Sequence, residues 1–362
     1  MNRNKVYKYI LSEEKLSKAD IAKDLGLSLP TVVQYVNELM SLDLVVENGK
    51  FQSTGGRKAT AVSCNENARY AIGIDITKKH INAVLLNLKG TVVDFKRVRC
   101  NFSDCDGYYQ IISSLIEEII VKNKVDREKV IGVGISIPAI VISEKSFGSK
   151  AIAEMPHDLY DKLEPYVHFQ YRFFNDSNSG GFAEQWVWDS SKTITYFSLS
   201  DTVGGAIISN GGIYYGDNMR SGEFGHMVIN PNGKRCYCGN IGCVDVYCSS
   251  RVLSDHADGS LEKFFEYVDK GDKKYVDIFN EYLNNLVLAI NNIRMCFDCD
   301  IILGGYMGRF LAKYLDGIKE LVKEKNMFFQ NDAEFIKVGK FSFEAASVGS
   351  ALYYIDQFIN NI

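Results

Sequence analysis

The chain has 362 residues, of which 46% are hydrophobic and 24% are charged, and its formal net charge is −4. The length predicts two or three domains, and the composition excludes disordered and fibrous proteins. No run of about eighteen apolar residues is present and the N-terminal segment lacks the features of a secretory signal, so we expect a cytoplasmic protein with no membrane span and reduced thiols.

The first 64 residues predict a small helical domain. Residues 4–12 and 18–25 have helical spacing, and Gly26 supplies the stop after the second helix. Ser28 is a natural N-cap for a third helix, in which Pro30 sits early, where its missing N–H costs little. The buried side of this third helix is expected to carry Val32, Val33, Val36 and Leu39.

Asn48-Gly49 lies between residues 44–46 and 50–52 and predicts a short hairpin with a two-residue turn. Helix, helix, turn, helix and hairpin is the order of a winged helix-turn-helix, which places its third helix in the major groove of DNA. The three helices could instead form a protein-interaction domain. The hairpin directly after the third helix favours DNA binding.

Candidate DNA contacts lie on the third helix opposite the valines, at the preceding helix and turn, and on the wing. They are Lys23, Ser28, Thr31, Gln34, Tyr35, Lys50, Arg57 and Lys58. Residues 1–64 hold nine basic and seven acidic residues against 32 and 38 in the remainder, so the acidity belongs mostly to the rest of the chain. The moderate charge of this domain predicts few phosphate contacts per subunit, so one subunit should bind DNA weakly. We therefore expect a homodimer, with a tetramer as the alternative.

A Gly-rich connector over residues 53–58 precedes a change to longer strands, and we place the domain boundary near residue 64. Two β-meanders are predicted, and each has an acidic turn, at Asp75 and Asp201, which indicates an internal duplication. The meander strands are 70–76, 81–88 and 91–98 in the first half and 193–199, 205–209 and 212–214 in the second. Further predicted elements are a strand over 130–137 and helices over 107–122, 272–297, 309–324 and 344–359.

One histidine and three cysteines lie within a short segment of the second half: His226, Cys236, Cys238 and Cys243. One imidazole and three thiolates form the ligand set of a closed, tetrahedral, structural zinc site, and the glycines of the loop allow the tight turn that such a site needs. Three thiols rarely share so short a loop in a cytosolic protein without a metal. The other six cysteines are expected to be ordinary reduced thiols: Cys64, Cys100, Cys105, Cys248, Cys296 and Cys299.

Together with the winged head and its Gly-Gly-Arg-Lys connector, these motifs resemble the ROK family of repressors, open reading frames and sugar kinases, over nearly the whole chain. The resemblance implies an α/β protein with an N-terminal winged helix-turn-helix at 1–64 and a two-lobed, actin-like or ribonuclease-H-like sugar-sensing domain at 65–362. Lobe 1 is expected at about 65–185 plus 344–362. Lobe 2, with the zinc loop, is expected at about 186–343.

The resemblance also implies the sugar contacts, which are Asn175, Asp176, Glu223, His226 and Asp245. In the kinases of the family the residue equivalent to Asp176 is the general base. From the sequence alone, Asn175-Asp176 follows a predicted strand over 167–174, where α/β sheets place ligands, although an N-cap is the alternative explanation. Asp245 stands where the family usually has Glu.

Two phosphate-binding turns differ from the kinase pattern of the family. The first turn has Thr77 where the kinases have glycine, and the second turn gains the acid Asp201. A Cβ in the first turn and a carboxylate in the second both disfavour polyphosphate, whereas Gly304-Gly305 on the adenosine side is retained.

We therefore expect no catalytic residues and a repressor of carbohydrate genes that binds operator DNA under the control of a sugar or sugar phosphate in the interlobe cleft. The alternative is an ATP-dependent sugar kinase with an added DNA-binding head, which an intact Asp176 favours. A zinc-stabilised interaction protein that binds neither sugar nor specific DNA is a third interpretation.

Overall fold

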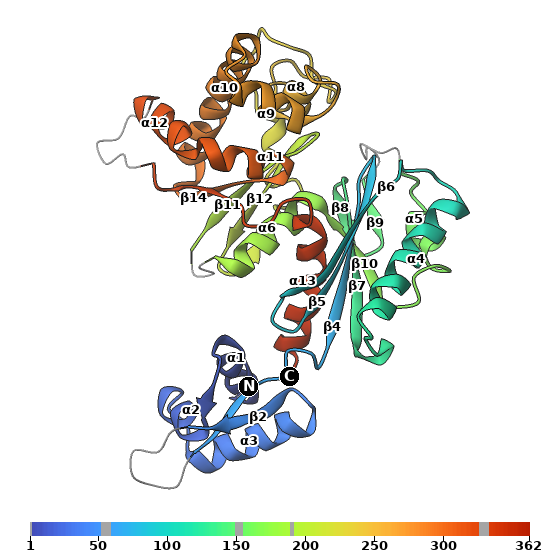
Figure 1. Ribbon diagram of the computed structural model, residues 1–362, viewed down its shortest axis with the longest axis vertical. Coiled ribbons are helices and arrows are strands. Elements are labelled where there is room, and N and C mark those ends of the chain that lie inside the picture. The colour runs from blue at the N-terminus through green and yellow to red at the C-terminus, as the bar shows by residue number, and fades with distance from the viewer. Residues whose placement is uncertain (1, 52–58, 149–154, 189–191, 326–332) are drawn as a thin grey trace.

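The computed structural model describes residues 2–51, 59–148, 155–188, 192–325 and 333–362 (Figure 1). An N-terminal head, a first lobe and a second lobe follow one another along the longest axis. No helix within these ranges has the length and apolar character needed to cross a bilayer.

The head contains three helices and a small antiparallel sheet. Its helices are α1 (Asn2–Ser12), α2 (Lys18–Asp24) and α3 (Leu29–Ser41). Its strands are β1 (Leu16–Ser17), β2 (Val45–Lys50) and β3 (Thr60–Cys64), in the order β1-β3-β2. The predicted winged helix-turn-helix is therefore confirmed, with the sheet as its wing.

Local hydrogen bonds explain why these helices start where they do. Ser17 caps α2 through a capping box with Asp20, and the Ser28 hydroxyl accepts the N–H of Thr31 at 3.3 Å at the start of α3. Gly26 has φ +64 and follows the end of α2, as predicted. Of the apolar positions predicted for α3, Val32, Val36 and Leu39 are fully buried, whereas Val33 is only partly buried.

The predicted Asn48-Gly49 hairpin is wrong. Both residues lie within β2, which is one continuous strand and pairs with β3 rather than folding back on itself. Gly49 has φ +79, and the register shifts by one residue between Glu47 and Lys50, so the glycine serves a β-bulge and not a turn. The wing is thus longer than predicted, and the predicted connector over 53–58 lies outside the described residues.

Each lobe is built on a five-stranded mixed sheet with the same topology. In lobe 1 the order is β10-β7-β4-β5-β6, and in lobe 2 it is β13-β12-β11-β14-β15. In both sheets three antiparallel strands are followed by two parallel ones, which is what the predicted duplication requires. The lobe 1 strands are β4 (Tyr70–Ile76), β5 (His80–Asn87), β6 (Val92–Arg99), β7 (Val130–Ile137) and β10 (Tyr171–Asn175). The lobe 2 strands are β11 (Ile194–Leu199), β12 (Val203–Ser209), β13 (Gly212–Ile213), β14 (Asp300–Gly304) and β15 (Ile336–Val338).

Two helices, α6 (Asp176–Val187) and α13 (Ala345–Asn360), lie between the two sheets (Figure 1). They approach closely because Gly349 has no side chain: a Cβ there would lie 1.7 Å from the carbonyl oxygen of Ser179. A side chain at Gly73 of β4 would similarly meet the carbonyl oxygen of Ser347 at 1.8 Å. The α6–α13 pair therefore joins the lobes through glycine-mediated contacts.

The remaining elements cover the outer faces. Around lobe 1 they are α4 (Asp106–Lys122), α5 (Leu159–Leu163), β8 (Val141–Ser143), β9 (Ser146–Phe147) and the 3₁₀ turn Arg127–Lys129. Around lobe 2 they are α7 (Asp245–Cys248), α8 (Arg251–Ser254), α9 (Leu261–Asp269), α10 (Lys273–Phe297), α11 (Gly305–Leu311), α12 (Leu315–Lys325) and the 3₁₀ turns Phe224–His226 and Ala312–Tyr314.

One predicted helix differs from the structure. The continuous helix expected over 309–324 is interrupted by the 3₁₀ turn Ala312–Tyr314 between α11 and α12. Within this turn Tyr314 packs edge-on against Phe279 of α10, and its hydroxyl donates to Asp269 of α9 at 2.7 Å. Tertiary contacts of one aromatic side chain thus accompany the break, and helical periodicity alone does not reveal them.

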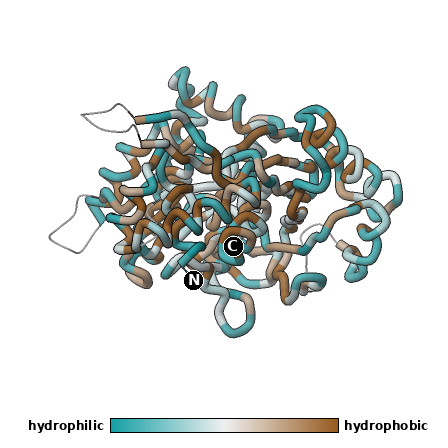
Figure 2. Tube along the Cα trace, turned by 90° about the horizontal axis from the view of Figure 1, so that it is seen from below, coloured by the Kyte–Doolittle hydropathy of each residue, from teal (hydrophilic) through white to brown (hydrophobic). Residues whose placement is uncertain are grey.

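The head rests on α13, and the two ends of the chain lie side by side in both views (Figures 1 and 2). The Arg3 guanidinium donates to the carbonyl oxygen of Ile362, and Lys8 Nζ donates to Asn360 Oδ1 at 2.7 Å. Buried residues of α1, such as Val6, belong to the same hydrophobic core as Leu352 of α13. The position of the head is therefore tied to a helix that also reaches the region between the lobes.

Candidate functional site

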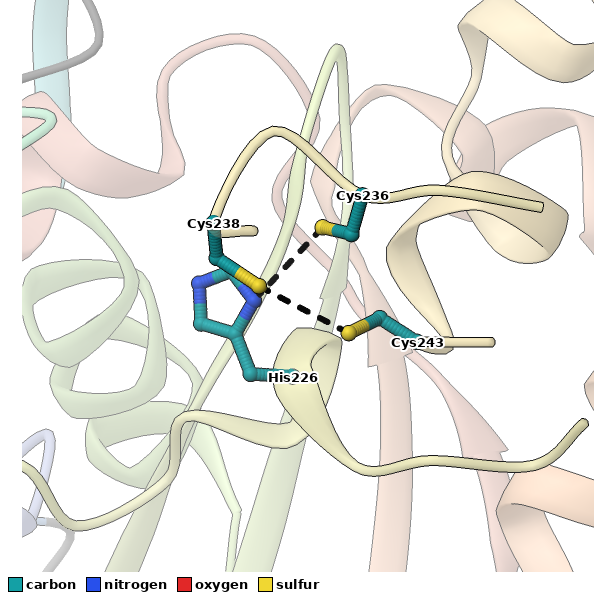
Figure 3. A group of neighbouring side chains, drawn as sticks. All are labelled: His226, Cys236, Cys238 and Cys243. Carbon is teal, nitrogen blue, oxygen red and sulfur yellow. Dashed lines mark hydrogen bonds between the residues drawn. The ribbon is translucent and has the colours of Figure 1, made fainter. Parts of the chain in front are cut away.

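The four predicted metal ligands converge in lobe 2 (Figure 3). One nitrogen of His226 and the sulfur atoms of Cys236, Cys238 and Cys243 all lie within 4.8 Å of one another. His226 Nδ1 lies 4.0 Å from Cys236 Sγ, and the Sγ atoms of Cys238 and Cys243 are 3.7 Å apart. In the loop between the cysteines, positive φ angles at the glycines supply the predicted left-handed turns: Gly239 (φ +99) and Gly242 (φ +81).

The geometry and chemistry of this group fit a zinc ion. Two sulfurs bound at about 2.3 Å to one tetrahedral centre are roughly 3.8 Å apart, close to the Cys238–Cys243 separation. Burial and the neighbouring thiols raise the pKa of Cys243 to about 12, so a cation would be needed to hold it as a thiolate. All four ligand positions are protein atoms, which is the arrangement of a structural site.

The second ring nitrogen of His226 faces other partners. Its Nε2 atom lies 3.3 Å from the Tyr237 hydroxyl and 3.9 Å from Glu223 Oε2. A metal on Nδ1 would fix the orientation of the ring and hence the position of Nε2 beside Glu223. Sequence reasoning misses Tyr237, because only its place between two metal ligands distinguishes it from other tyrosines.

Asn175 and Asp176 lie where β10 ends and α6 begins. The Asn175 side chain caps α6 by accepting the N–H of Asn178 at 2.9 Å, and its Nδ2 donates to the carbonyl oxygen of Ala139 at 3.1 Å. The N-cap alternative is therefore correct for Asn175, and both ends of its amide are engaged. Asp176 Oδ1 accepts the N–H of Ser177 at 2.7 Å, and its second oxygen has no hydrogen-bond partner among the residues that the structure describes.

Three carboxylates influence one another here. Burial and the charge of Asp176 raise the pKa of Asp75 to about 7, and burial and the charge of Glu223 raise the pKa of Asp176 to about 6. Asn82 donates to one oxygen of Asp75 at 2.9 Å, whereas the other oxygen is buried without a partner in the described part of the chain. Strongly perturbed carboxylates of this kind cluster at functional sites.

Asp245 differs from the other predicted sugar contacts. Its Oδ1 accepts the backbone N–H of Val203 at 2.7 Å, and the residue is only 6% exposed. The carboxylate therefore holds the turn between β11 and β12 in place, and burial raises its pKa. Asp245 thus has a structural role at this turn, and direct contact with a sugar stays a prediction.

A cavity of about 300 Å³ lies beside Asn175, between β10, α6 and the β12–β13 hairpin. Its lining combines polar side chains, such as Asn178, with apolar ones, such as Phe182 and Met219. Asn175 lines this cavity, whereas the other four predicted sugar contacts do not. The cavity is therefore adjacent to the predicted sugar site without coinciding with it.

In the predicted first phosphate turn, the Thr77 hydroxyl makes hydrogen bonds to the backbone of the turn itself. The Thr77 hydroxyl accepts the N–H groups of Lys79 at 3.3 Å and His80 at 2.9 Å, and it donates to the carbonyl oxygen of His80 at 3.0 Å. Successive backbone N–H groups of this kind are the donors that a phosphate needs at a turn. The Thr77 hydroxyl thus takes up two backbone N–H groups of this turn, and whether the turn can still bind phosphate stays a prediction.

The second phosphate turn is held by hydrogen bonds and carries an exposed acid. Asp201 Oδ1 accepts the Ser250 hydroxyl at 3.1 Å, and the Ser200 carbonyl oxygen accepts the N–H of Ser250 at 2.8 Å. Burial and the charge of Arg97 lower the pKa of His80, and the charge of Asp201 from the other lobe opposes this shift. A carboxylate here would repel a polyphosphate.

Aromatic side chains pack after the retained Gly304-Gly305 turn. Tyr306 lies against Phe343 with ring centroids 4.6 Å apart, and the Arg97 guanidinium of lobe 1 lies 3.7 Å from the centroid of Phe343. The Arg309 guanidinium also lies over this ring, 4.7 Å from its centroid. Arg97 therefore links the lobes beside the predicted nucleotide position.

The third helix of the head presents a polar face to solvent. Its exposed residues Pro30, Gln34, Asn37 and Ser41 follow at intervals of three or four, on the side away from buried Val32. Gln34 is among the predicted DNA contacts, whereas Asn37, which the same helical spacing identifies, is not. Gln34 Nε2 donates to Glu38 at 3.0 Å, and Asn37 accepts from Lys18 at 3.4 Å.

The other predicted DNA contacts differ in exposure. Lys23, Ser28 and Lys50 are exposed, whereas Thr31 and Tyr35 are partly buried. Tyr35 packs against the hydrophobic core, and the hydroxyls of Thr31 and Ser28 share a hydrogen bond of 2.7 Å. Two further predicted contacts lie outside the described residues: Arg57 and Lys58.

Comparison with known proteins assigns both parts of the chain. Residues 71–357 match the ROK family, and residues 2–46 match a winged helix-turn-helix DNA-binding family. The xylose repressor of Bacillus subtilis strain 168 is 30% identical over 70% of this chain and 67% of its own length. The putative xylose repressor of Caldicellulosiruptor sp. strain Rt8B.4 is 26% identical over 99% of this chain and 96% of its own.

A solved structure agrees with the fold over almost the whole chain. The crystal structure of a ROK family transcriptional regulator, described as a homologue of the E. coli MLC protein, matches with a TM-score of 0.78. It is 22% identical, and the match covers 99% of this chain and 96% of that one. The head and both lobes therefore occur together in a known structure.

Proposed function

We propose, from the premise that the chain belongs to the ROK family, that it is a sugar-responsive DNA-binding transcriptional regulator that represses carbohydrate genes. The single observation that carries this proposal is the combination of a complete winged head with a ROK body whose first phosphate turn is closed by Thr77. A sugar between the lobes, with no phosphoryl donor beside it, can act as a signal but not as a kinase substrate.

Asp176, Glu223 and His226 would contact the sugar hydroxyls, with Asn175 and Asp245 positioning the surrounding turns. Two observations support this assignment. The pKa of the Asp176 carboxyl is raised, and the His226 Nε2 atom lies on the side of the ring away from the thiols, so both residues offer a polar group toward the same region. A zinc ion, held by one histidine and the three clustered cysteines, would fix the His226 ring. It would supply structure and no catalysis.

The DNA-reading surface would be the exposed face of α3, with Gln34 and Asn37 in the major groove and Lys50 on the wing near the backbone. A homodimer would double these contacts, which one head supplies only sparsely. We place the protein in the cytoplasm, where operator DNA lies and where thiols stay reduced.

A sugar could act on DNA binding through α13. This helix packs against α6, whose first residue is Asp176, and the far end of the chain holds the head through Asn360 and Ile362. A change in lobe closure that moves α13 would therefore move the head and alter the spacing of two heads in a dimer.

The kinase alternative rests on Asp176, whose raised pKa of about 6 would suit a general base. Opposing it are the closed first turn and the carboxylate of Asp201 in the second. The deciding experiment is a titration of the protein with its own upstream DNA, with and without a panel of sugars, together with an ATP turnover assay on the same panel. Repression requires DNA binding that a sugar changes, and the kinase requires turnover.

A further inference from the structure

A groove of about 570 Å³ lies where the head meets lobe 1, away from the sugar and zinc residues. It is lined by α1, by the segment that follows α3, by β10 and by α13. This volume is in the range of small-molecule sites, which often form at domain junctions.

Positive charge dominates the lining of this junction groove. Three arginines, Arg3, Arg69 and Arg172, face one acid, Glu144. Arg3 is already engaged by Glu38 and by the carbonyl oxygen of Ile362. Whether the groove offers unpaired N–H donors to a ligand therefore depends on Arg69 and Arg172.

Arg172 and Arg69 retain unused donors. Arg172 donates through Nη1 to Glu144 at 2.8 Å and to the Tyr353 hydroxyl, and its Nε is buried without a partner. Its Nη2 makes no hydrogen bond within the described part of the chain and is the donor left for a ligand. Arg69 donates to the carbonyl oxygen of Ala68 at 2.7 Å and, among the described residues, has no carboxylate partner. A guanidinium N–H that has no acceptor in the protein gains a hydrogen bond when a ligand supplies one.

The remaining lining suits a phosphorylated molecule of sugar size. Guanidinium groups bind phosphate through paired N–H donors, and two of them match a dianion better than a single carboxylate. The side-chain amides of Gln170 and Gln357 make no hydrogen bonds within the described ranges, so they can meet hydroxyl groups. We propose that the junction groove binds a phosphorylated small metabolite through Arg69 and Arg172.

Such a ligand would contact both the head and helix α13 of the body. Leu42 and Leu44, directly after the DNA-reading helix α3, line the groove from the head, and Gln357 of α13 lines it from the body. A ligand that contacts both sides favours the head position in which the groove is formed. The effect of this ligand on DNA binding rests on the proposed function, whereas binding of the ligand to the groove does not.

Arg172 also connects this groove to the sugar side of lobe 1. It lies on β10 three residues before Asn175 and lines both the junction groove and the 300 Å³ cavity beside Asn175. A phosphorylated metabolite at the junction and a sugar between the lobes would therefore act on opposite ends of the same short strand.

The test is a calorimetric titration of the full chain with inorganic phosphate, and with hexose and pentose monophosphates beside their unphosphorylated parents, at constant ionic strength. Binding of phosphate compounds should weaken at least tenfold in Arg69→Gln and less in Arg69→Lys, which keeps the charge but loses the paired donors. Arg99→Gln removes the same charge from an exposed position on β6, at the opposite edge of the sheet from β10, and should bind as the wild type does.

The variant Asp176→Asn separates this site from the proposed sugar site. Phosphate binding that persists in Asp176→Asn and is lost in Arg69→Gln supports the junction groove. No binding of any phosphate compound to the wild type, equal binding by Arg69→Gln, or loss in Asp176→Asn overturns it. Failure of the proposed function has a different signature: no sugar changes DNA affinity while phosphate binding is unaltered.

Discussion

The hydroxyl of Thr77 accepts the backbone N–H of His80 at 2.9 Å and donates to the carbonyl oxygen of the same residue at 3.0 Å. Together with the N–H of Lys79, a second backbone donor of the predicted first phosphate turn is thereby engaged from within the protein. Because Asp201 adds a negative charge across the lobes, removing the threonine hydroxyl alone would not restore a phosphate site.

The wild-type protein should therefore show no sugar-dependent ATP turnover. Thr77→Gly should also show none, since Asp201 and the Tyr306–Phe343 pair remain in place. A coupled assay of ADP release with hexoses, pentoses and amino sugars measures this. Turnover that disappears in Asp176→Asn would instead establish the kinase alternative.

Replacing Asp75 by Asn should change how stability depends on pH. The pKa of Asp75 is raised to about 7 in the folded protein from an ordinary value of 3.8, so the folded state holds a proton that the unfolded state releases. The stability that protonated Asp75 contributes to the wild type should therefore be lost as pH rises from about 4 to about 7. At about 1.4 kcal/mol per pKa unit, this loss is on the order of 4 kcal/mol.

Asp75→Asn removes this pH dependence because the amide does not ionise. The difference in free energy of unfolding between variant and wild type should favour the variant most at pH 8 and shrink toward pH 4. Urea denaturation at several pH values measures it. A difference that does not vary with pH would show that Asp75 ionises normally in the folded state.

The purified protein should contain about one zinc ion per chain. Cys238→Ser should lose most of the metal and lower the melting temperature, because binding free energy at a structural site contributes directly to folding. Cys296→Ser is the matched control, as Cys296 is exposed and lies outside the cluster, and it should retain the metal. Elemental analysis and thermal melts give both readouts, and wild-type protein purified without any bound zinc would contradict the assignment.

On α3, the proposed DNA-reading helix, Gln34→Ala and Asn37→Ala should each weaken operator binding by about 1–3 kcal/mol, which is roughly five- to 150-fold. Lys50→Ala should weaken binding to all DNA sequences. It should also reduce the slope of log affinity against log salt concentration by about one, as expected for the loss of one phosphate contact. Fluorescence anisotropy with labelled DNA measures these effects. The control is Lys270→Ala, which alters an exposed lysine at the end of α9 in lobe 2. Equal losses of operator affinity in Lys270→Ala and Gln34→Ala would show that α3 is not the DNA-reading surface.

Much of this site is predictable because its determinants are local in sequence. The spacing of three cysteines and one histidine identifies the metal cluster, and Ser17 and Ser28 mark the starts of two head helices. Asn48-Gly49 does not form the predicted turn because a glycine with positive φ serves a bulge as well, and pairing of β2 with β3 decides between them.

Features that depend on contacts between distant residues are not predictable in this way. The break before α12 accompanies the packing of Tyr314 against α10, and the link between the lobes comes from Arg97 against Phe343. The junction groove combines residues from both ends of the chain, so no local pattern contains it.

The most direct test of sugar-controlled DNA binding is operator affinity measured across a sugar panel for the wild type and Asp176→Asn. We expect one sugar to change the wild-type dissociation constant for its upstream DNA by about tenfold or more, a coupling free energy within the usual range for allosteric proteins. Asp176→Asn should bind the same DNA normally and lose that response. DNA binding that no sugar alters, or an unchanged response in Asp176→Asn, would contradict control through the interlobe site.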